Sequence, residues 1–312
     1  MLTNWCNYRC PYCFGIDLMA PKMAKKNMSQ ETFEGIITWL SKTPESKVIH
    51  LMGGEPTLHP DFEGMVEYLL ARDFNITIFS NLATHQARGY AEKLSDLPVA
   101  WVVNINPPDT WDDARRTRIM SALKTLGPKA TITFNIMPDE ENNNWAIELI
   151  KECHLNRCVK VGFVLPTVTG SNFYLNDGQY DVVAGKVVEL ARDAEKEHVR
   201  LEYECGVPTC VFSEEQLGIL WDAGSPCDSG CCSIMDITPD GEIIYCLPLA
   251  TKHAVHFSEF STYGDAKNWF ETKWQPYRRL GRTEHCFHCN LMRPDACHGG
   301  CLAKILLNAK NV

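Results

Sequence analysis

The first half of the chain alternates between two patterns of apolar residues. From residue 30 to about residue 166, short runs of consecutive apolar residues, typical of buried strands, alternate with longer stretches in which apolar residues recur every three or four positions, as on one face of a helix. Such alternation is typical of a parallel sheet joined by right-handed helical crossovers. The expected strands, counting an entry strand at the start of the chain, are 2–5, 48–52, 75–80, 99–105, 130–136 and 159–165. The expected helices are 30–40, 61–72, 84–94, 111–125, 143–154 and 178–197. The sequence therefore predicts an α/β fold with about six β/α units.

The pattern changes after about residue 200. A short strand that enters a loop is expected from residue 201, and two further β-type runs are joined at Pro239-Asp240-Gly241. An Asp-Gly pair favours the tight turn of a β-hairpin. Ten of the 15 cysteines fall between Cys205 and Cys301. We therefore expect two domains, residues 1–200 and residues 201–312.

Composition and charge narrow the function classes. The 312 residues are 45% apolar, which is enough for a sizeable core. A net charge of -9 and a pI near 5.6 argue against a nucleic-acid surface, which needs clustered Lys and Arg. No apolar run approaches membrane-spanning length, and the five residues before Cys6 are too few for a signal peptide, so we expect a cytoplasmic protein without a membrane partner. In that reducing compartment, 15 cysteines indicate metal or redox chemistry rather than disulfides.

Three cysteines, Cys6, Cys10 and Cys13, lie within eight residues near the start of the chain. Three soft thiolates on one short loop can hold three corners of an iron-sulfur cube, and the fourth iron is then free to bind a cofactor or substrate. A zinc knuckle or a set of buried thiols is the alternative. Zinc normally takes four ligands, and no His lies close enough to complete such a site.

The C-x3-C-x2-C spacing, with Tyr12 before the last cysteine, resembles the cluster loop of the radical S-adenosylmethionine (radical SAM) superfamily. Gly53-Gly54-Glu55, at the end of an expected strand, resembles the GGE motif that binds the amino group of S-adenosylmethionine (SAM) through its backbone and carboxylate. Six β/α units match the partial (β/α)6 TIM-like barrel of this superfamily better than a full eight-fold barrel. The resemblance thus implies a 4Fe-4S cluster and SAM as cofactors.

Further SAM contacts are expected where strands of such a barrel end, because ligands bind at the carboxyl ends of parallel strands. Asn81, Asn104 and Asn135 are candidates to contact the ribose and carboxylate of SAM, although each one alone is more often a turn or cap residue. By the resemblance, Leu165 lies near the adenine and Tyr12 flanks the same ring.

The cysteines of the C-terminal third resemble a SPASM or twitch extension, which carries auxiliary iron-sulfur clusters in this superfamily. The resemblance rests on Gly241-x4-Cys246 after the hairpin and on Cys286-x2-Cys289-x7-Cys297-x3-Cys301. Two departures are a longer middle gap in the second motif and the lack of a cysteine after Cys301. A structural zinc domain is the alternative, because C-x2-C with C-x3-C also suits zinc.

The same resemblance implies ligand sets for one or two auxiliary clusters. The first set combines Cys246 and Cys301 with two of Cys227, Cys231 and Cys232. The second set contains Cys286, Cys289 and Cys297, and its fourth ligand stays open. Cys205 and Cys210 are outside both sets; each is a candidate for the missing ligand, for a catalytic thiol that returns hydrogen to a product radical, or for a merely buried residue.

The resemblance implies reductive cleavage of SAM to a 5'-deoxyadenosyl radical that abstracts hydrogen from a substrate. We favour a ribosomally made peptide, matured by crosslinking, oxidation or epimerisation, and the rival substrate is a small molecule such as an aminosugar. With five residues before the first cysteine, we expect a peptide to be recognised either by the barrel itself or by a separate leader-peptide-binding protein. An electron donor such as flavodoxin or ferredoxin is also expected. An iron-sulfur electron carrier or a zinc-stabilised interaction module is the alternative of another class.

Overall fold

The computed structural model describes residues 1–19, 21–43, 47–140, 143–227, 235–290, 292, 297 and 299–309 of the chain. Its centre is a six-stranded parallel sheet in the order β1-β2-β3-β4-β5-β6. The strands are β1 Val48–Leu51, β2 Asn75–Ser80, β3 Val99–Asn104, β4 Ala130–Ile136, β5 Cys158–Phe163 and β6 Arg200–Tyr203. Because each strand pairs with the next one in sequence, the predicted α/β fold with six parallel strands is confirmed.

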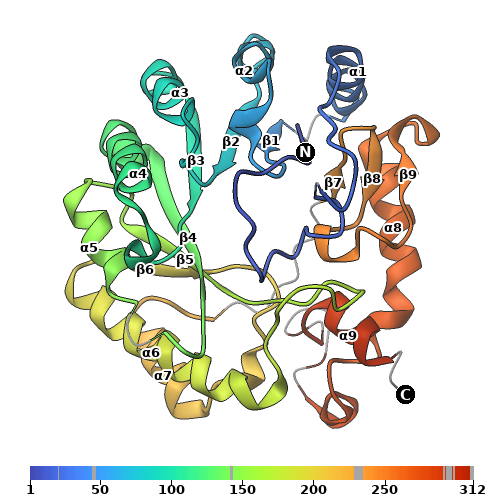
Figure 1. Ribbon diagram of the computed structural model, residues 1–312. Helices are drawn as coiled ribbons and strands as arrows, with labels where there is room; N and C mark the ends of the chain where they lie inside the picture. The colour runs from blue at the N-terminus through green and yellow to red at the C-terminus, as the bar shows by residue number, and fades with distance from the viewer. Residues whose placement is uncertain are drawn as a thin grey trace.

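In the described part of the chain, one helix precedes β1, one lies in each crossover between successive strands, and one follows β6. They are α1 Gln30–Leu40, α2 Phe62–Leu70, α3 Ala87–Leu94, α4 Asp113–Leu126, α5 Trp145–Glu152, α6 Tyr180–Lys196 and α7 Glu214–Asp222. Figure 1 shows the strands as an arc with these helices along its outside. The Ser29 hydroxyl caps α1 by accepting a hydrogen bond from Thr32 N (3.1 Å). Apolar side chains of the strands and helices form one core, in which Phe62, Met65 and Trp101 are fully buried.

One of the six strands is not the expected one. The segment 2–5 was expected to be the entry strand, but Thr3 makes only an isolated bridge to Asn27, and the neighbouring Leu2 N donates to Met52 O (2.7 Å), beyond the end of β1. The sixth strand is instead β6, which pairs with β5 and lies beyond residue 200. The sheet thus includes residues that were expected in the second domain, and the division of the chain into two domains stays a prediction.

The C-terminal third contains a small antiparallel sheet in the order β7-β8-β9, with β7 Asp236–Ile237, β8 Glu242–Ile244 and β9 Val255–His256. β7 and β8 form the predicted hairpin, and β9 was not predicted. Two helices follow, α8 Tyr263–Arg278 and α9 Leu302–Ala309. Trp39 of α1 stacks on Phe257 at 5.9 Å and donates to Phe260 O (2.8 Å), so this part packs against the β1 side of the arc (Figure 1). No helix in the described part of the chain is both long and apolar enough to cross a membrane.

Candidate active site

The cysteine loop, residues 6–13, belongs to the N-terminal segment that runs through the inside of the arc (Figure 1). The side chains of Cys6, Cys10 and Cys13 are all half-buried. Burial raises the pKa of Cys6 to about 12, and the nearby charges of Glu55 and of the other two loop thiols add to this rise. Deprotonating the three loop thiols together would place three negative charges near the carboxylate of Glu55. A cationic partner is needed before all three can be deprotonated together.

The donors of this loop fit an iron-sulfur cube. Three thiolates on one loop are soft ligands of the kind that hold such clusters, and no carboxylate or imidazole belongs to the loop. Within the residues that the structure describes, no three Cys, His, Asp or Glu side chains are arranged to hold a metal ion. The fit therefore rests on the type of donor and the shared location, and the ligand roles of Cys6, Cys10 and Cys13 stay a prediction.

Gly53 and Gly54 end the β1 region against the segment that leads into the cysteine loop. A Cβ at Gly53 would lie 2.3 Å from Thr3 O, and one at Gly54 would lie 2.2 Å from Trp5 O and 2.8 Å from Cys6 N. Gly54 N also donates to Thr3 O (2.7 Å). The sequence predicted that these glycines let the backbone approach a ligand; in the structure they let the chain's own backbone approach. Their contact with SAM stays a prediction.

Glu55 joins the ends of β1 and β2 and is 1% exposed. Its Oε1 accepts hydrogen bonds from Thr57 N (3.2 Å) and from the hydroxyl groups of Thr57 and Ser80 (2.7 Å each). Its Oε2 accepts one from Asn81 N (2.7 Å). Burial raises the pKa of Glu55, while these hydrogen bonds oppose the rise. Among the described residues Oε2 has one hydrogen-bond donor, Asn81 N. A carboxylate oxygen can accept two hydrogen bonds, so Oε2 has the capacity to accept a further one from an ammonium group.

Asn81 reaches from the end of β2 to the cysteine loop. Its Nδ2 donates to Asn7 Oδ1 (2.9 Å) and lies 3.8 Å from Cys6 Sγ. Its own backbone N–H is held by Glu55. The structure therefore connects the GGE carboxylate to the first loop cysteine through one side chain, and the expected contact of Asn81 with SAM stays a prediction.

The other predicted cofactor contacts lie at the ends of neighbouring strands. Asn104 is exposed at the end of β3, and Asn135 is half-buried near the end of β4. Gly162 lies opposite Asn135 on β5, where a Cβ would be 2.6 Å from Asn135 Oδ1, so this glycine leaves room for the amide. The Tyr12 hydroxyl donates to Asn106 Oδ1, a residue that the sequence did not single out.

Asn172 is a buried residue that the sequence analysis missed. Its Nδ2 donates to the carbonyl oxygens of Tyr12 (3.2 Å) and Leu165 (2.8 Å), and its Oδ1 accepts from Thr167 N (2.8 Å). It thus links the cysteine loop to the buried residue that was expected near the adenine. Tyr12 and Asn172 are 160 residues apart in sequence, and nothing local in the sequence signals such a pair.

Asp17 makes a second link of this kind. Its carboxylate accepts hydrogen bonds from the hydroxyl groups of Thr169 and Ser171 (2.6 Å each) and pairs with Lys22 at 3.2 Å. Burial acts to raise the pKa of Asp17, but the three donors together hold it below its usual value. The segment after the cysteine loop is therefore tied to the segment after β5 by an ionised carboxylate.

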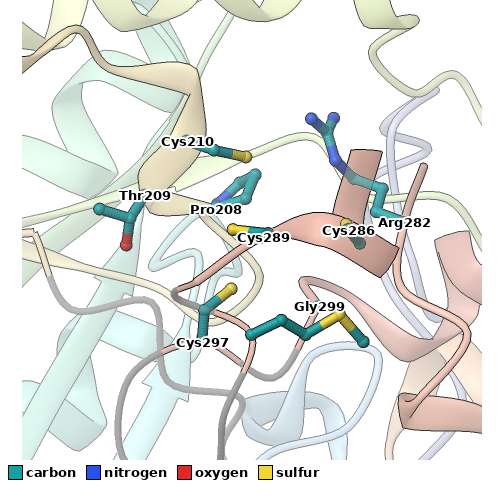
Figure 2. Close-up of a pocket in the computed structure, with 9 residues that line it drawn as sticks. Pro208, Thr209, Cys210, Arg282, Cys286, Cys289, Cys297 and Gly299 are labelled. Atoms are coloured by element: carbon teal, nitrogen blue, oxygen red, sulfur yellow. The ribbon is translucent and has the colours of Figure 1, made fainter. Parts of the chain in front are cut away.

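The extension brings four cysteines to one cavity (Figure 2). Cys210, Cys286, Cys289 and Cys297 line it together with Arg282. Three of the four are the predicted second cluster set; the fourth, Cys210, was a candidate for the missing ligand, for a catalytic thiol or for a merely buried residue. Its proximity to the others is a finding of the structure.

The predicted first cluster set is only partly described. Cys231 and Cys232 lie outside the described residues. Cys301 is buried, and Gly206 lies beside it, because a Cβ at Gly206 would be 3.3 Å from Cys301 Cβ. The half-buried Cys205 is the residue before Gly206; the half-buried Cys227 and Cys246 follow α7 and β8. The roles of this set stay predictions.

The amino-acid sequence was also compared with known families and proteins. The model of the radical SAM superfamily matches residues 1–174, more than half of the chain. The chain belongs to the radical SAM superfamily. This membership confirms the predicted family, and with it a 4Fe-4S cluster and SAM as the expected cofactors of the fold.

Three curated relatives of this radical SAM protein differ in how much of it they match. A SAM-dependent nucleotide dehydratase of Selenomonas ruminantium is 32% identical over 80 residues, which are 26% of this chain and 27% of that protein. A cofactor-modifying protein for tungsten-containing aldehyde ferredoxin oxidoreductase of Pyrococcus furiosus is 36% identical over 26% of this chain and 22% of its own length. The chain thus spans about a quarter of the length of these two relatives. PqqA peptide cyclase of Methylorubrum populi is 24% identical over 98% of this chain and 79% of its own length.

Solved structures share the fold along almost the whole chain. Streptococcus suis SuiB bound to its precursor peptide SuiA superposes with a TM-score of 0.67 at 15% identity, over 97% of this chain and 70% of SuiB. The enzyme anSMEcpe with bound AdoMet gives a TM-score of 0.66 at 16% identity, over 96% of this chain and 86% of its own. At these identities the likeness shows the fold alone, and it confirms the predicted open, partial barrel.

Proposed function

We propose that this radical SAM protein is a peptide maturase that cleaves SAM reductively and abstracts hydrogen from a ribosomally made peptide. The observation that carries the proposal is the similarity to PqqA peptide cyclase along 98% of the chain, because it includes the extension as well as the barrel. SuiB, whose structure contains a precursor peptide, supports a peptide substrate through its shared fold. The nucleotide dehydratase matches only 26% of the chain and therefore supports a small-molecule substrate less well.

The residues of the candidate site have separate roles in this proposal. Cys6, Cys10 and Cys13 would hold the cluster, which when reduced would supply the electron that cleaves bound SAM to methionine and the 5'-deoxyadenosyl radical. Glu55, with one oxygen that has a single donor, accepts the SAM ammonium group. The remaining contacts surround the rest of SAM at the strand ends; they are Tyr12, Gly53, Gly54, Asn81, Asn104, Asn135 and Leu165.

Partners and place in the cell follow from this chemistry. The cluster needs an electron from a donor such as flavodoxin or ferredoxin, and a separate leader-peptide-binding protein would present the peptide. We propose two domains, a barrel and an extension with auxiliary clusters, with the boundary moved from residue 200 to the end of β6, since β6 pairs within the barrel sheet. The cytoplasm suits a protein with 15 cysteines, because its reducing conditions preserve thiols.

Isotope transfer tests the proposal. Anaerobically reconstituted protein, reduced by flavodoxin, is supplied with SAM and a candidate precursor peptide that carries deuterium at its side chains. We expect deuterium in the 5'-deoxyadenosine and a mass change in the peptide, and neither with a Cys13→Ala variant. Deuterium from a labelled aminosugar instead would identify the small-molecule alternative. No 5'-deoxyadenosine from a sample with full iron content would leave an electron carrier as the better explanation.

A further inference from the structure

A cavity in the extension is lined by nine residues, four of which are cysteines. Cys210 comes from the 3-10 turn Thr209–Val211 after β6, and Cys286 from the 3-10 turn Glu284–His288. Cys289 directly follows that second turn, and Cys297 pairs with Met292 in an isolated bridge. Figure 2 shows the sulfur atoms of Cys210, Cys289 and Cys297 turned toward the same space. Four thiols from three parts of the chain therefore meet at one place.

The local structure directs Cys210 into this cavity. Val207, Val211 and Phe212 on either side of it are buried, which leaves Cys210 as the exposed residue of its turn. The turn is closed by a hydrogen bond from Val211 N to Pro208 O (3.2 Å). Ser213 then begins α7 with a capping box, so the backbone around Cys210 is fixed at both ends.

A glycine lets Cys286 lie in the wall of the cavity. Gly281 has a φ of +68°, and a Cβ there would lie 2.2 Å from Cys286 Cβ. Any larger residue would push Cys286 away from the other three thiols. The sequence after α8 is thus shaped to hold this cysteine close to the backbone of its own loop.

The cavity also has an excess of buried positive charge. The side chains of Arg282, which lines the cavity, and Lys304 are only 11% and 7% exposed. Their shared carboxylate is Asp177, at 3.4 Å from Arg282 and 4.0 Å from Lys304, and it is 60% exposed. In the described part of the chain, Asp177 is the carboxylate paired with these cations, and each cation also lies over an aromatic ring, Arg282 over Tyr180 (4.5 Å to the ring centroid) and Lys304 over Tyr174 (5.1 Å). One solvated carboxylate and two ring faces compensate two buried charges only in part. An anionic group inside the cavity would complete this balance.

We propose that Cys210 is the fourth thiolate ligand of a 4Fe-4S cluster held by Cys286, Cys289 and Cys297. Four thiolates around a cubane core carry net negative charge, which matches the buried cations beside the cavity. With every iron bound to a cysteine, this cluster has no open position for substrate, and its role is to accept or relay electrons. It also clamps the turn after β6 to the extension. The inference concerns the metal site only and does not rest on the peptide substrate.

Metal analysis tests this assignment without any turnover of SAM. In a Cys6/Cys10/Cys13→Ala background, which removes the loop cluster, we expect Cys210→Ala to lose about four irons and four sulfides per chain. A cluster that stays bound by three thiolates would change the EPR spectrum of the reduced protein, which also supports the assignment. The matched control is Cys153→Ala, at a buried cysteine after α5, and it should change neither iron content nor spectrum.

A second measurement avoids any concern about folding of the variant. In the wild-type protein with its clusters intact, Cys210 should resist alkylation, although its side chain is exposed in its turn, and it should react once iron is chelated. Equal alkylation before and after chelation would overturn the proposal. So would unchanged iron, sulfide and EPR in Cys210→Ala, or zinc in place of iron in the parent protein.

Discussion

A single methyl group at Gly54 should disrupt the candidate active site. In Gly54→Ala, the new Cβ would lie 2.2 Å from Trp5 O, which is about 1 Å short of ordinary contact. Trp5 O accepts the hydrogen bond of Glu55 N (2.8 Å), and Cys6 N lies 2.8 Å from the same Cβ, so none of these backbone atoms can move alone. Overpacking of this kind costs about 1–3 kcal/mol. Because the displaced segment carries Cys6, a shift of about 1 Å should also lower the rate of SAM cleavage by about 10²-fold.

Gly89→Ala is the matched control for this substitution. Gly89 lies in α3 with nothing within 4 Å of an added Cβ, so alanine there should stabilise the protein by about 0.5–1 kcal/mol. Urea denaturation gives the free energy of unfolding of both variants, and the yield of 5'-deoxyadenosine gives their activity. If Gly54→Ala unfolds and cleaves SAM as Gly89→Ala does, the glycine pair does not position the cysteine loop, and our reading of the contact is wrong.

Three further predictions concern residues that were not identified as site residues from the sequence alone. Asp17→Asn should lower the free energy of unfolding by about 1 kcal/mol at pH 7, because partly screened hydrogen bonds to a carboxylate are weakened. Since the pKa of Asp17 is lowered in the folded state, this difference, measured by urea denaturation, should be present above the unfolded pKa of about 3.9 and disappear as the pH falls through the lower folded value; a difference independent of pH would contradict it. Asn172→Ala should lower the free energy of unfolding by about 1–3 kcal/mol, because it removes the donor to the carbonyl groups of Tyr12 in the cysteine loop and of Leu165 after β5. It should also weaken SAM binding, measured by calorimetry, and unchanged affinity would contradict this link. Arg282→Gln removes a positive charge from the cavity wall, so it should shift the reduction potential of the proposed four-cysteine cluster to more negative values, whereas Arg282→Lys should keep the potential near that of the wild type. If redox titration gives the same potential for Arg282→Gln and the wild type, Arg282 does not influence the cluster.

The sequence predicted most of the barrel because its strands are short runs rich in apolar residues and its helices carry apolar residues at helical spacing. Such local patterns identified the strands β1 to β5 and the helices α1 to α6 closely. They failed for the first strand, because residues 2–5 have a strand-like pattern but run beside the end of β1 and its following loop. The short β6 was expected as a strand, but no local pattern indicates that it pairs with β5.

Residues of the candidate site were predictable where the chemistry is local. Three cysteines on one loop and Gly-Gly-Glu after a strand carry their meaning in a few neighbouring residues. Asn172 and Asp17 were missed because their partners lie more than 150 residues away, and a single buried amide or carboxylate has no local signature. Cys210 was predicted as a candidate residue, but the sequence did not predict its location, since only the folded chain brings it to the cavity lined by the other three cysteines.

The central claim is that the cysteine loop makes this chain a SAM-cleaving enzyme. The most direct test measures iron, sulfide and 5'-deoxyadenosine in anaerobically reconstituted, reduced protein, beside the Cys6/Cys10/Cys13→Ala variant. We expect the variant to lose about four irons and all 5'-deoxyadenosine while it keeps the metal of its extension. Equal iron in both proteins, or no 5'-deoxyadenosine from fully loaded wild type, would contradict the account.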